Sequence, residues 1–248
     1  MTRPKTLVLS LLLAAALTPV LAQTPRSVLE EAYLMGIGEN VSLYIDMIIN
    51  TNTGDKSRQL EIFMRQDSGG TKILAQIVNP TFLKNMKFLQ HRPTDGRDST
   101  WLKTSRGVRR LSSNSTSERL FDSDFTVEDF SPITTEDFQV SFLPEDANPL
   151  PECFAVAAQP LKSDRNYSEK VYYIDRTESI LKRVDYYDAD GDLVKRYELL
   201  EIQEANGRAY PLRSTMEDLS RNTSTQLLFT TVDEDTALPS RIFNKGSL

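Results

Sequence analysis

The sequence predicts a mainly β protein with few helices, an α+β chain in which one large antiparallel sheet curls on itself. Apolar and polar residues alternate with a period of two in many short segments, the first of which begins at Val41. Gly, Asn, Asp and Pro residues, which favour turns, separate these segments at a regular spacing. Helical spacing is confined to one short segment near the start of the chain, so helices contribute little to the predicted fold.

The first 22 residues have the features of a cleavable secretory signal peptide. Arg3 and Lys5 precede an apolar run that is too short to span a bilayer. The small residues Val20 and Ala22 occupy the −3 and −1 positions of the expected cleavage site. We therefore expect cleavage after Ala22 and a single domain over residues 23–248. No Cys lies near the cleavage site, which excludes a lipid-modified N-terminus of the bacterial lipoprotein type.

Charge and cysteine content narrow the class of partner and the source of stability. Removing Arg3 and Lys5 leaves 27 basic and 35 acidic residues, a net charge of −8. Such a surface repels phosphate, so nucleic acid is not an expected partner. Cys153 is the only cysteine and cannot form an internal disulfide, and we expect it to be buried and unreactive. The mature chain must depend on a hydrophobic core.

Residues 24–36 predict a helix that packs over one face of the sheet, because Thr24 can cap its N-terminus and Pro25 fits its first turn. Residues 131–146 fit either a short helix followed by an extended piece or a covering loop. The apolar tail residues Ile242 and Phe243 are expected to dock onto the domain. Strands are predicted at residues 41–49, 59–65, 73–77, 86–91, 100–102, 108–111, 153–157, 170–174, 180–187, 193–202, 209–216 and 225–232.

Turns between these strands are marked by Gly, Asn and Asp. The predicted turns lie at residues 52–55, 67–70, 95–96, 105–107, 188–192, 206–207 and 221–222. The turn at 188–192, Asp-Ala-Asp-Gly-Asp, resembles the opening of a calcium loop. An EF-hand loop needs Glu near position 12, where this chain has Leu199, so we interpret the segment as a solvated turn.

The most distinctive stretch spans residues 97–130. It holds the only tryptophan, Trp101, and a basic cluster that contains Arg109 and Arg110, followed by an acidic and aromatic block at residues 122–130. The first half predicts a hairpin that turns at Gly107, because Gly tolerates the positive φ that such a turn requires. The second half is expected to form an exit loop.

This stretch resembles the signature of the outer membrane lipoprotein-sorting protein family, LolA-like periplasmic carriers that are often found alongside RND-type exporters. The family pattern is a Trp-x-Tyr-x-Pro strand, an Arg-Arg pair and Gly-Ser-Asp-Phe-Ser-Tyr-Glu-Asp. The chain departs from it at Lys103, Asp122, Thr126 and Val127 and lacks the turn proline, and the resemblance extends more weakly from Gln59 to Phe243. The matching residues are Trp101, Arg109, Arg110, Ser123, Asp124, Phe125, Glu128 and Asp129.

The resemblance implies an incompletely closed β-barrel of the LolA/LolB type, with a helical lid and an apolar cavity for acyl chains. It implies a periplasmic carrier or chaperone that moves lipoproteins or other lipids between the inner and outer membranes. It also implies an RND-type exporter or an outer-membrane acceptor as a partner. The runner-up hypothesis is a non-enzymatic accessory or sensing module of a membrane exporter, with the same fold and a filled core.

Alternation and size select the residues that could line such a cavity. Tyr44, Phe63 and Leu74 put apolar groups on the second face of their strands, so both faces of the sheet must be at least partly covered. The residues that we select as cavity candidates could equally form an ordinary dry core. The cavity candidates are Leu43, Ile45, Met47, Leu60, Ile62, Met64, Ile73, Ile77, Phe88 and Trp101.

Catalytic and metal-binding patterns are scarce, so we expect no enzyme activity, metal or cofactor. His91 is the only histidine, and no nucleophile elbow, Walker A loop or dinucleotide fingerprint is present. The carboxylates of residues 122–129 could suggest acid-base or metal chemistry. We interpret them instead as ion-pair partners of Arg109, Arg110 and Arg119 that fix the loop. An enzyme acting on lipid or glycan is the third hypothesis.

Overall fold

The computed structural model describes residues 23–34, 39–94, 98–112, 115–130, 135–162, 165–205, 208–234 and 237–248. The predicted signal peptide and the predicted turns at 95–96 and 206–207 lie outside these residues, as does the end of the predicted helix beyond Leu34.

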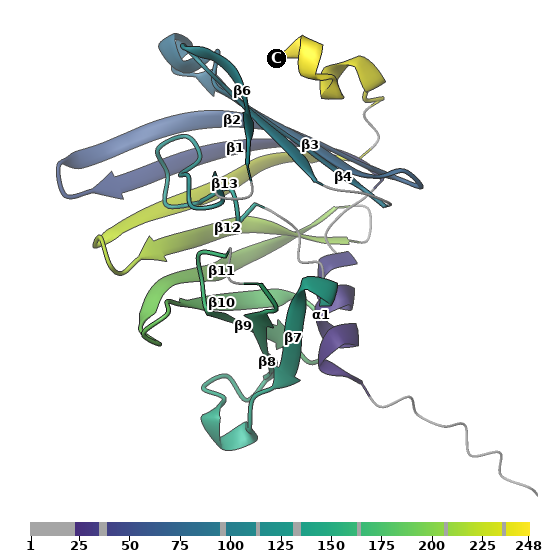
Figure 1. Cartoon of the computed structure of the whole chain (residues 1–248), viewed down its shortest axis with the longest axis vertical. Helices are drawn as coiled ribbons and strands as arrows, with labels where there is room; N and C mark the ends of the chain where they lie inside the picture. Colours follow the sequence, from purple (N-terminus) through teal and green to yellow (C-terminus); the bar gives the residue numbers. More distant parts are fainter. Residues whose placement is uncertain are drawn as a thin grey trace, which may run out of the picture.

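The described strands form one antiparallel sheet in the order β6-β5-β4-β3-β2-β1-β13-β12-β11-β10-β9-β8-β7 (Figure 1). Strands that are neighbours in sequence pair with each other, except β6 and β7, which form the two edges. The first strand also pairs with the last, and Met47 lies opposite Leu227. The strands are β1 (Asn40–Thr51), β2 (Gly54–Asp67), β3 (Gly70–Asn79), β4 (Lys87–Pro93), β5 (Ser99–Thr104), β6 (Gly107–Leu111), β7 (Phe138–Phe142), β8 (Cys153–Pro160), β9 (Glu169–Asp175), β10 (Leu181–Tyr187), β11 (Leu193–Ala205), β12 (Arg208–Asp218) and β13 (Thr223–Asp233).

The sheet curls without closing, which confirms the predicted fold class. The edge strands β6 and β7 stand at opposite ends of the strand order and do not pair with each other in the described part of the chain. A closed barrel would need that pairing to remove its edges. Because β6 and β7 are consecutive in sequence, the chain must cross the sheet between them.

The inner face of the curl carries the main core. In β1, Val41, Leu43 and Ile45 are buried, whereas Tyr44 and Ile48 point outward and are exposed. The same alternation places Leu60 and the other apolar residues of the neighbouring strands in one continuous cluster. The predicted period-two alternation is therefore confirmed in β1.

The hairpin of β5 and β6 forms as predicted, and the turn between them enters β6 at Gly107 with φ of 119°. A side chain there would face a steric penalty, so Gly fits the position. The structure also distinguishes the two alternatives for residues 131–146 over the part that it describes, 135–146. Thr135–Asp137 forms a short 3-10 turn that leads directly into β7, which matches the helix-then-extended alternative.

The single described α-helix, α1 (Pro25–Leu34), covers only the β7–β9 end of the sheet. The Thr24 hydroxyl accepts a hydrogen bond from the Ser27 backbone N–H at 3.1 Å, which is the predicted N-cap. Val28 and Leu29 are buried in the main core. The helical cover is thus partial, and another segment must shield the rest of the inner face.

The outer face carries two smaller clusters. The C-terminal 3-10 turns, η5 (Ser240–Phe243) and η6 (Lys245–Ser247), bring Phe243 against Leu74 and Leu89, with Ile242 beside them. The predicted docking of the tail is confirmed. At the other end of the sheet, Leu143 and Leu150 flank η4 (Glu145–Ala147) and pack over the outer face of β8 and β9.

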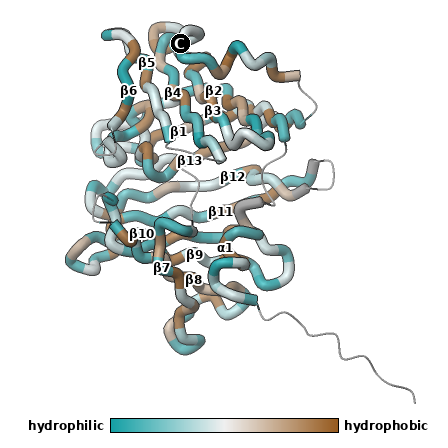
Figure 2. Tube along the Cα trace, turned by 45° about the vertical axis from the view of Figure 1, so that its right-hand side comes forward, coloured by the Kyte–Doolittle hydropathy of each residue, from teal (hydrophilic) through white to brown (hydrophobic). Residues whose placement is uncertain are grey.

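Hydrophobic and hydrophilic residues are interspersed along the strands in Figure 2. Among the residues that the structure describes, no helix is long and apolar enough to cross a membrane.

Candidate functional site

Residues 115–130, which we call the inner loop, carry most of the family motif and lie over the inner face of the sheet. Leu120, Phe121 and Phe125 are buried in the main core with the inward residues of the strands. The loop turns sharply at Phe121 and Asp122, whose φ values are 55° and 61°. Position 122 is where the family pattern has Gly, the residue that adopts this backbone most readily.

Asp124 fastens the inner loop to β13. Its carboxylate is fully buried and accepts hydrogen bonds from Thr223 Oγ1 at 2.6 Å and Thr225 Oγ1 at 2.7 Å. Its backbone N–H donates to Thr225 Oγ1 at 2.9 Å. Arg119 adds an ion pair at 3.3 Å and also donates to the carbonyl oxygens of Asp122 and Ser123. This set of bonds fixes the turn against the sheet.

Glu128 makes a buried ion pair with a residue of β9. Lys170 Nζ lies 2.8 Å from Glu128 Oε1, and the two side chains are 6% and 2% exposed. Glu128 Oε2 accepts a hydrogen bond from the Asn166 backbone N–H at 2.9 Å. The Lys170 ammonium also lies over the rings of Tyr167 and Tyr186, 5.0 and 5.5 Å from their centroids. Desolvated cation–π contacts of this kind stabilise a buried lysine.

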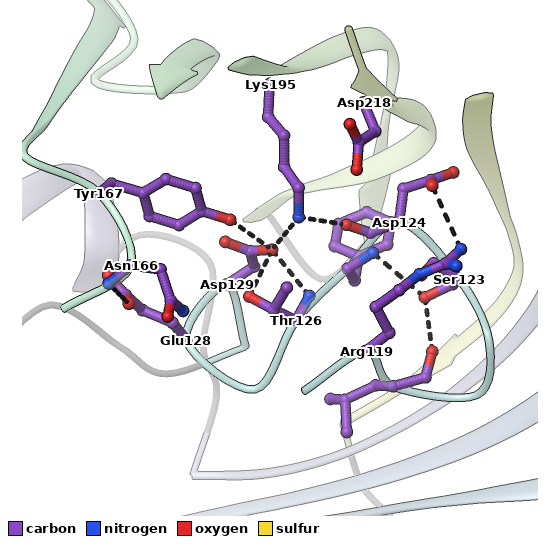
Figure 3. Close-up of polar contacts among 12 residues, drawn as sticks. Arg119, Ser123, Asp124, Thr126, Glu128, Asp129, Asn166, Tyr167, Lys195 and Asp218 are labelled. Carbon is purple, nitrogen blue, oxygen red and sulfur yellow. Dashed lines mark hydrogen bonds and ion pairs between the residues drawn. The ribbon is translucent and has the colours of Figure 1, made fainter. Parts of the chain in front are cut away.

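Asp129 forms the second buried pair, with Lys195 of β11 (Figure 3). Its Oδ2 accepts from the Thr126 N–H at 2.8 Å, the Thr126 hydroxyl at 2.9 Å, Lys195 Nζ at 3.4 Å and the Tyr167 hydroxyl at 3.5 Å. Lys195 donates as well to the backbone oxygen of Asp124 at 2.7 Å. Burial, and then the nearby Asp129 charge, raise the pKa of Tyr167, so this hydroxyl stays protonated and can donate.

A pocket of about 230 Å³ opens between the inner loop and strands β9 to β13. One wall is charged and the others are aromatic or aliphatic. Burial raises the pKa of Tyr197 in this pocket, and the Ser214 side chain opposes part of that shift. The lining residues are Phe125, Glu128, Asp129, Phe130, Lys170, Tyr172, Leu181, Val184, Tyr186, Tyr197, Ser214, Leu227 and Phe229.

The ten cavity candidates lie elsewhere. Nine belong to the main core or pack against it on the inner face of β1–β4, and none of the ten is among the described residues that line the pocket. Trp101 lies on the outer face in the cluster of Leu74, Leu89 and Phe243. Its position there follows from the register, because Trp101 pairs with Leu89, which faces outward. Whether these residues contact a ligand stays a prediction.

The ion-pair prediction is right for one arginine and wrong for two. Arg119 pairs with Asp124, but Arg109 pairs with Glu118, and Arg110 donates to the Ser99 hydroxyl at 2.8 Å. The partners of Glu128 and Asp129 are lysines that sequence reasoning missed. A signal for them exists, since Lys170 lies in phase with Tyr172 and Ile174 of β9, and Lys195 lies in phase with Tyr197, which packs against the main core. A lysine on the apolar face of a strand needs a buried partner.

His91 and the acidic turn have structural places. The His91 ring lies edge-on to Trp101 with 5.1 Å between centroids, and its Nε2 lies 2.6 Å from the Phe243 carbonyl oxygen. It therefore holds the C-terminal tail. In the turn at 188–192, the Asp188 carboxylate accepts the N–H groups of Asp190 and Asp192, both at 3.0 Å. Among the described residues, no group of three His, Cys, Asp or Glu is placed to hold a metal ion.

The comparisons with known proteins agree with this architecture. A domain of Vibrio parahaemolyticus assigned to the outer membrane lipoprotein-sorting proteins superposes with a TM-score of 0.81 at 22% identity, covering 90% of this chain and 97% of that chain. A DUF1329 family protein of Desulfovibrio piger gives 0.80 at 18% identity, with 92% and 100% covered. A LolA superfamily protein of Nitrosomonas europaea gives 0.73 at 18% identity, with 92% and 100% covered.

The curled open sheet with a loop on its inner face thus defines a protein of the LolA-like fold, as the sequence resemblance predicted. A family model described as an uncharacterized protein matches residues 69–248, which is more than half of the chain. The chain belongs to that family. A search of curated protein sequences found no match.

Proposed function

We propose that this protein is a periplasmic carrier or chaperone that binds the acyl chains of lipoproteins or other lipids and moves them between the inner and outer membranes. It performs no chemistry on its cargo and needs no cofactor. The observation that carries the proposal is the pocket beneath the inner loop, where aromatic and aliphatic side chains surround an open space inside a LolA-like sheet. The likeness to lipoprotein-sorting and LolA superfamily structures supports the same reading.

The physical basis is transfer of hydrocarbon from water into an apolar space. Each buried methylene contributes about 0.8 kcal/mol, so a chain of ten methylenes gains roughly 8 kcal/mol. The pocket of about 230 Å³ is smaller than typical ligand sites of about 300–1,000 Å³. A long chain therefore requires the pocket to widen through movement of side chains, because Asp124, Glu128 and Asp129 fix the loop backbone against the sheet. Phe125 and Phe130 are the loop residues that would shift.

Delivery of the cargo depends on a change between a wide and a narrow form of the pocket. Binding shifts an equilibrium only through a difference in affinity between two states, so release requires a partner that favours the narrow form of the pocket. An RND-type exporter or an outer-membrane acceptor would supply that difference. The secretory signal predicted over residues 1–22 supports a periplasmic location, where such partners would meet the protein.

A second candidate function rests on a separate observation. The nine inner-face candidates on β1–β4 belong to the packed main core or lie against it, so this part of the sheet is filled. A filled LolA-like domain suits a non-enzymatic accessory or sensing module that contacts a membrane exporter. In that case the pocket would be a local gap in packing, and no lipid would accompany the protein.

Lipid extraction and mass spectrometry of protein purified gently from its native host distinguish the two functions. We expect co-purifying acyl lipid with the unaltered protein and its loss in Leu181→Trp, in which an indole fills the pocket. Ile48→Trp is the matched control, because Ile48 lies on the outer face and is 40% exposed. Equal thermal unfolding midpoints would show that both variants fold. Absence of lipid from every preparation of the unaltered protein would favour the accessory module.

A further inference from the structure

The two oxygens of Asp129 are treated very differently. Oδ2 receives hydrogen bonds from the two donors of Thr126, from Tyr167 and from Lys195. Oδ1 has no hydrogen-bond partner among the described residues, although the side chain is only 1% exposed. Asp129 also lines the pocket. A buried carboxylate oxygen without a donor is unfavourable, and a donor placed in the pocket would relieve it.

Lys170 supplies the complementary group on the same wall. Its ammonium carries three N–H donors and forms an ion pair with Glu128 Oε1 at 2.8 Å, without the geometry of a hydrogen bond to that oxygen. The rings of Tyr167 and Tyr186 lie near the same nitrogen. The pocket wall can therefore offer one more hydrogen bond to an acceptor, beside the acceptor oxygen of Asp129.

The charges of this wall already balance. Glu128 and Asp129 carry two negative charges, and their partners Lys170 and Lys195 carry two positive charges. All four side chains are at most 9% exposed. A charged ligand headgroup would add an uncompensated charge to a desolvated site, which is strongly unfavourable. A neutral polar group adds none.

We propose that the pocket selects neutral amphiphiles in which a hydroxyl or amide N–H stands beside the alkyl chain. The donor binds Asp129 Oδ1, the oxygen of the same polar end accepts from Lys170, and the chain lies along Tyr172, Leu227 and Phe229. This inference rests on the proposed carrier function and specifies its ligand class. It excludes free fatty acids as preferred cargo, because they are anionic and lack the donor.

Isothermal titration calorimetry of the purified mature protein tests the selection with four ligands of equal chain length at pH 8. Decanol and decanamide carry a donor, methyl decanoate is neutral without one, and decanoate is an anion. We expect the two donors to bind about tenfold or more tightly than methyl decanoate, as suits a hydrogen bond to a charged group. Decanoate should bind least tightly.

Two variants test whether Asp129 is the source of the preference for ligands that carry a hydrogen-bond donor. Asp129→Leu combined with Lys195→Met keeps the wall neutral and removes the acceptor oxygens, so the donor preference should fall to within about twofold. Leu181→Ala is the matched control, because it shortens an apolar wall and should weaken all four ligands by a similar factor. The ligand series on the unaltered protein needs neither variant, so a variant that fails to fold leaves the selection testable.

The outcomes separate the inference from the proposed function. If none of the four ligands binds the unaltered protein, carriage of acyl chains is wrong and the inference falls with it. If the ligands bind but decanoate or methyl decanoate matches the donors, carriage stands and the selection is wrong. If the donor preference survives in the folded double variant, Asp129 is not its source.

Discussion

Replacing Lys195 by Met tests whether the buried ion pairs hold the inner loop in place. The change keeps the length of the side chain but removes the donor to Asp129 Oδ2 at 3.4 Å and to the Asp124 carbonyl oxygen at 2.7 Å. Removing one partner of a buried pair typically costs about 3–5 kcal/mol. Because the Thr126 N–H, the Thr126 hydroxyl and Tyr167 still serve Asp129, we expect the low end, about 3 kcal/mol.

Urea unfolding at pH 7.5 measures this free energy, provided that the slope with urea is unchanged. Lys182→Met is the matched control, since Lys182 is 34% exposed and lies 4.0 Å from Asp175, and it should cost less than about 1 kcal/mol. Adding Asp129→Asn to Lys195→Met removes both charges and should restore part of the loss. The reasoning is refuted if Lys195→Met costs no more than the control, or if the two losses simply add.

Three further predictions follow from the structure. Burial lowers the pKa of His91 in the folded protein, so the unfolded chain binds a proton more readily than the folded protein as the pH falls below about 6.5. The free energy of unfolding, measured with urea, should therefore drop from pH 7.5 to 5.5, and His91→Gln should flatten this dependence. A dependence that persists in His91→Gln would show that other groups cause it. Burial raises the pKa of the Cys153 thiol to about 11. A thiol reagent at pH 8 should therefore label Cys153 only at urea concentrations that unfold the protein. Rapid labelling of the folded protein would contradict the burial of this thiol. Asp122 has a φ of 61°, which Gly adopts more readily than Ala. The free energy of unfolding of Asp122→Gly should therefore exceed that of Asp122→Ala by at least about 1 kcal/mol. Equal values would show that the turn relaxes.

The strands were predictable because each inward residue repeats with the period of the pleat. In β1, every second residue from Val41 to Ile49 is buried, so local pattern and tertiary structure agree. β7 escaped a firm prediction because Phe138–Phe142, although it alternates, is short and lies beside acidic residues that also suit a loop. Its identity as a strand depends on pairing with β8, which no local pattern contains.

The site was harder to predict, since it depends on which strands form the edges. The motif residues Asp124, Glu128 and Asp129 were found from the resemblance, but their lysine partners come from β9 and β11. Only the crossing of the chain from β6 to β7 brings them together. The pocket formed over the second half of the sheet for the same reason, whereas alternation and size had selected the first half.

The pairing of the first strand with the last has a consequence for biogenesis. Met47 and Leu227 face each other across the middle of the sheet although they are 180 residues apart in sequence. Contacts of such high order are formed late, after the entropy of closing a long loop has been overcome. A chain emerging from a ribosome would lack its central seam until β13 had been synthesised. Until then, the edge of β1 that later pairs with β13 would lack its partner.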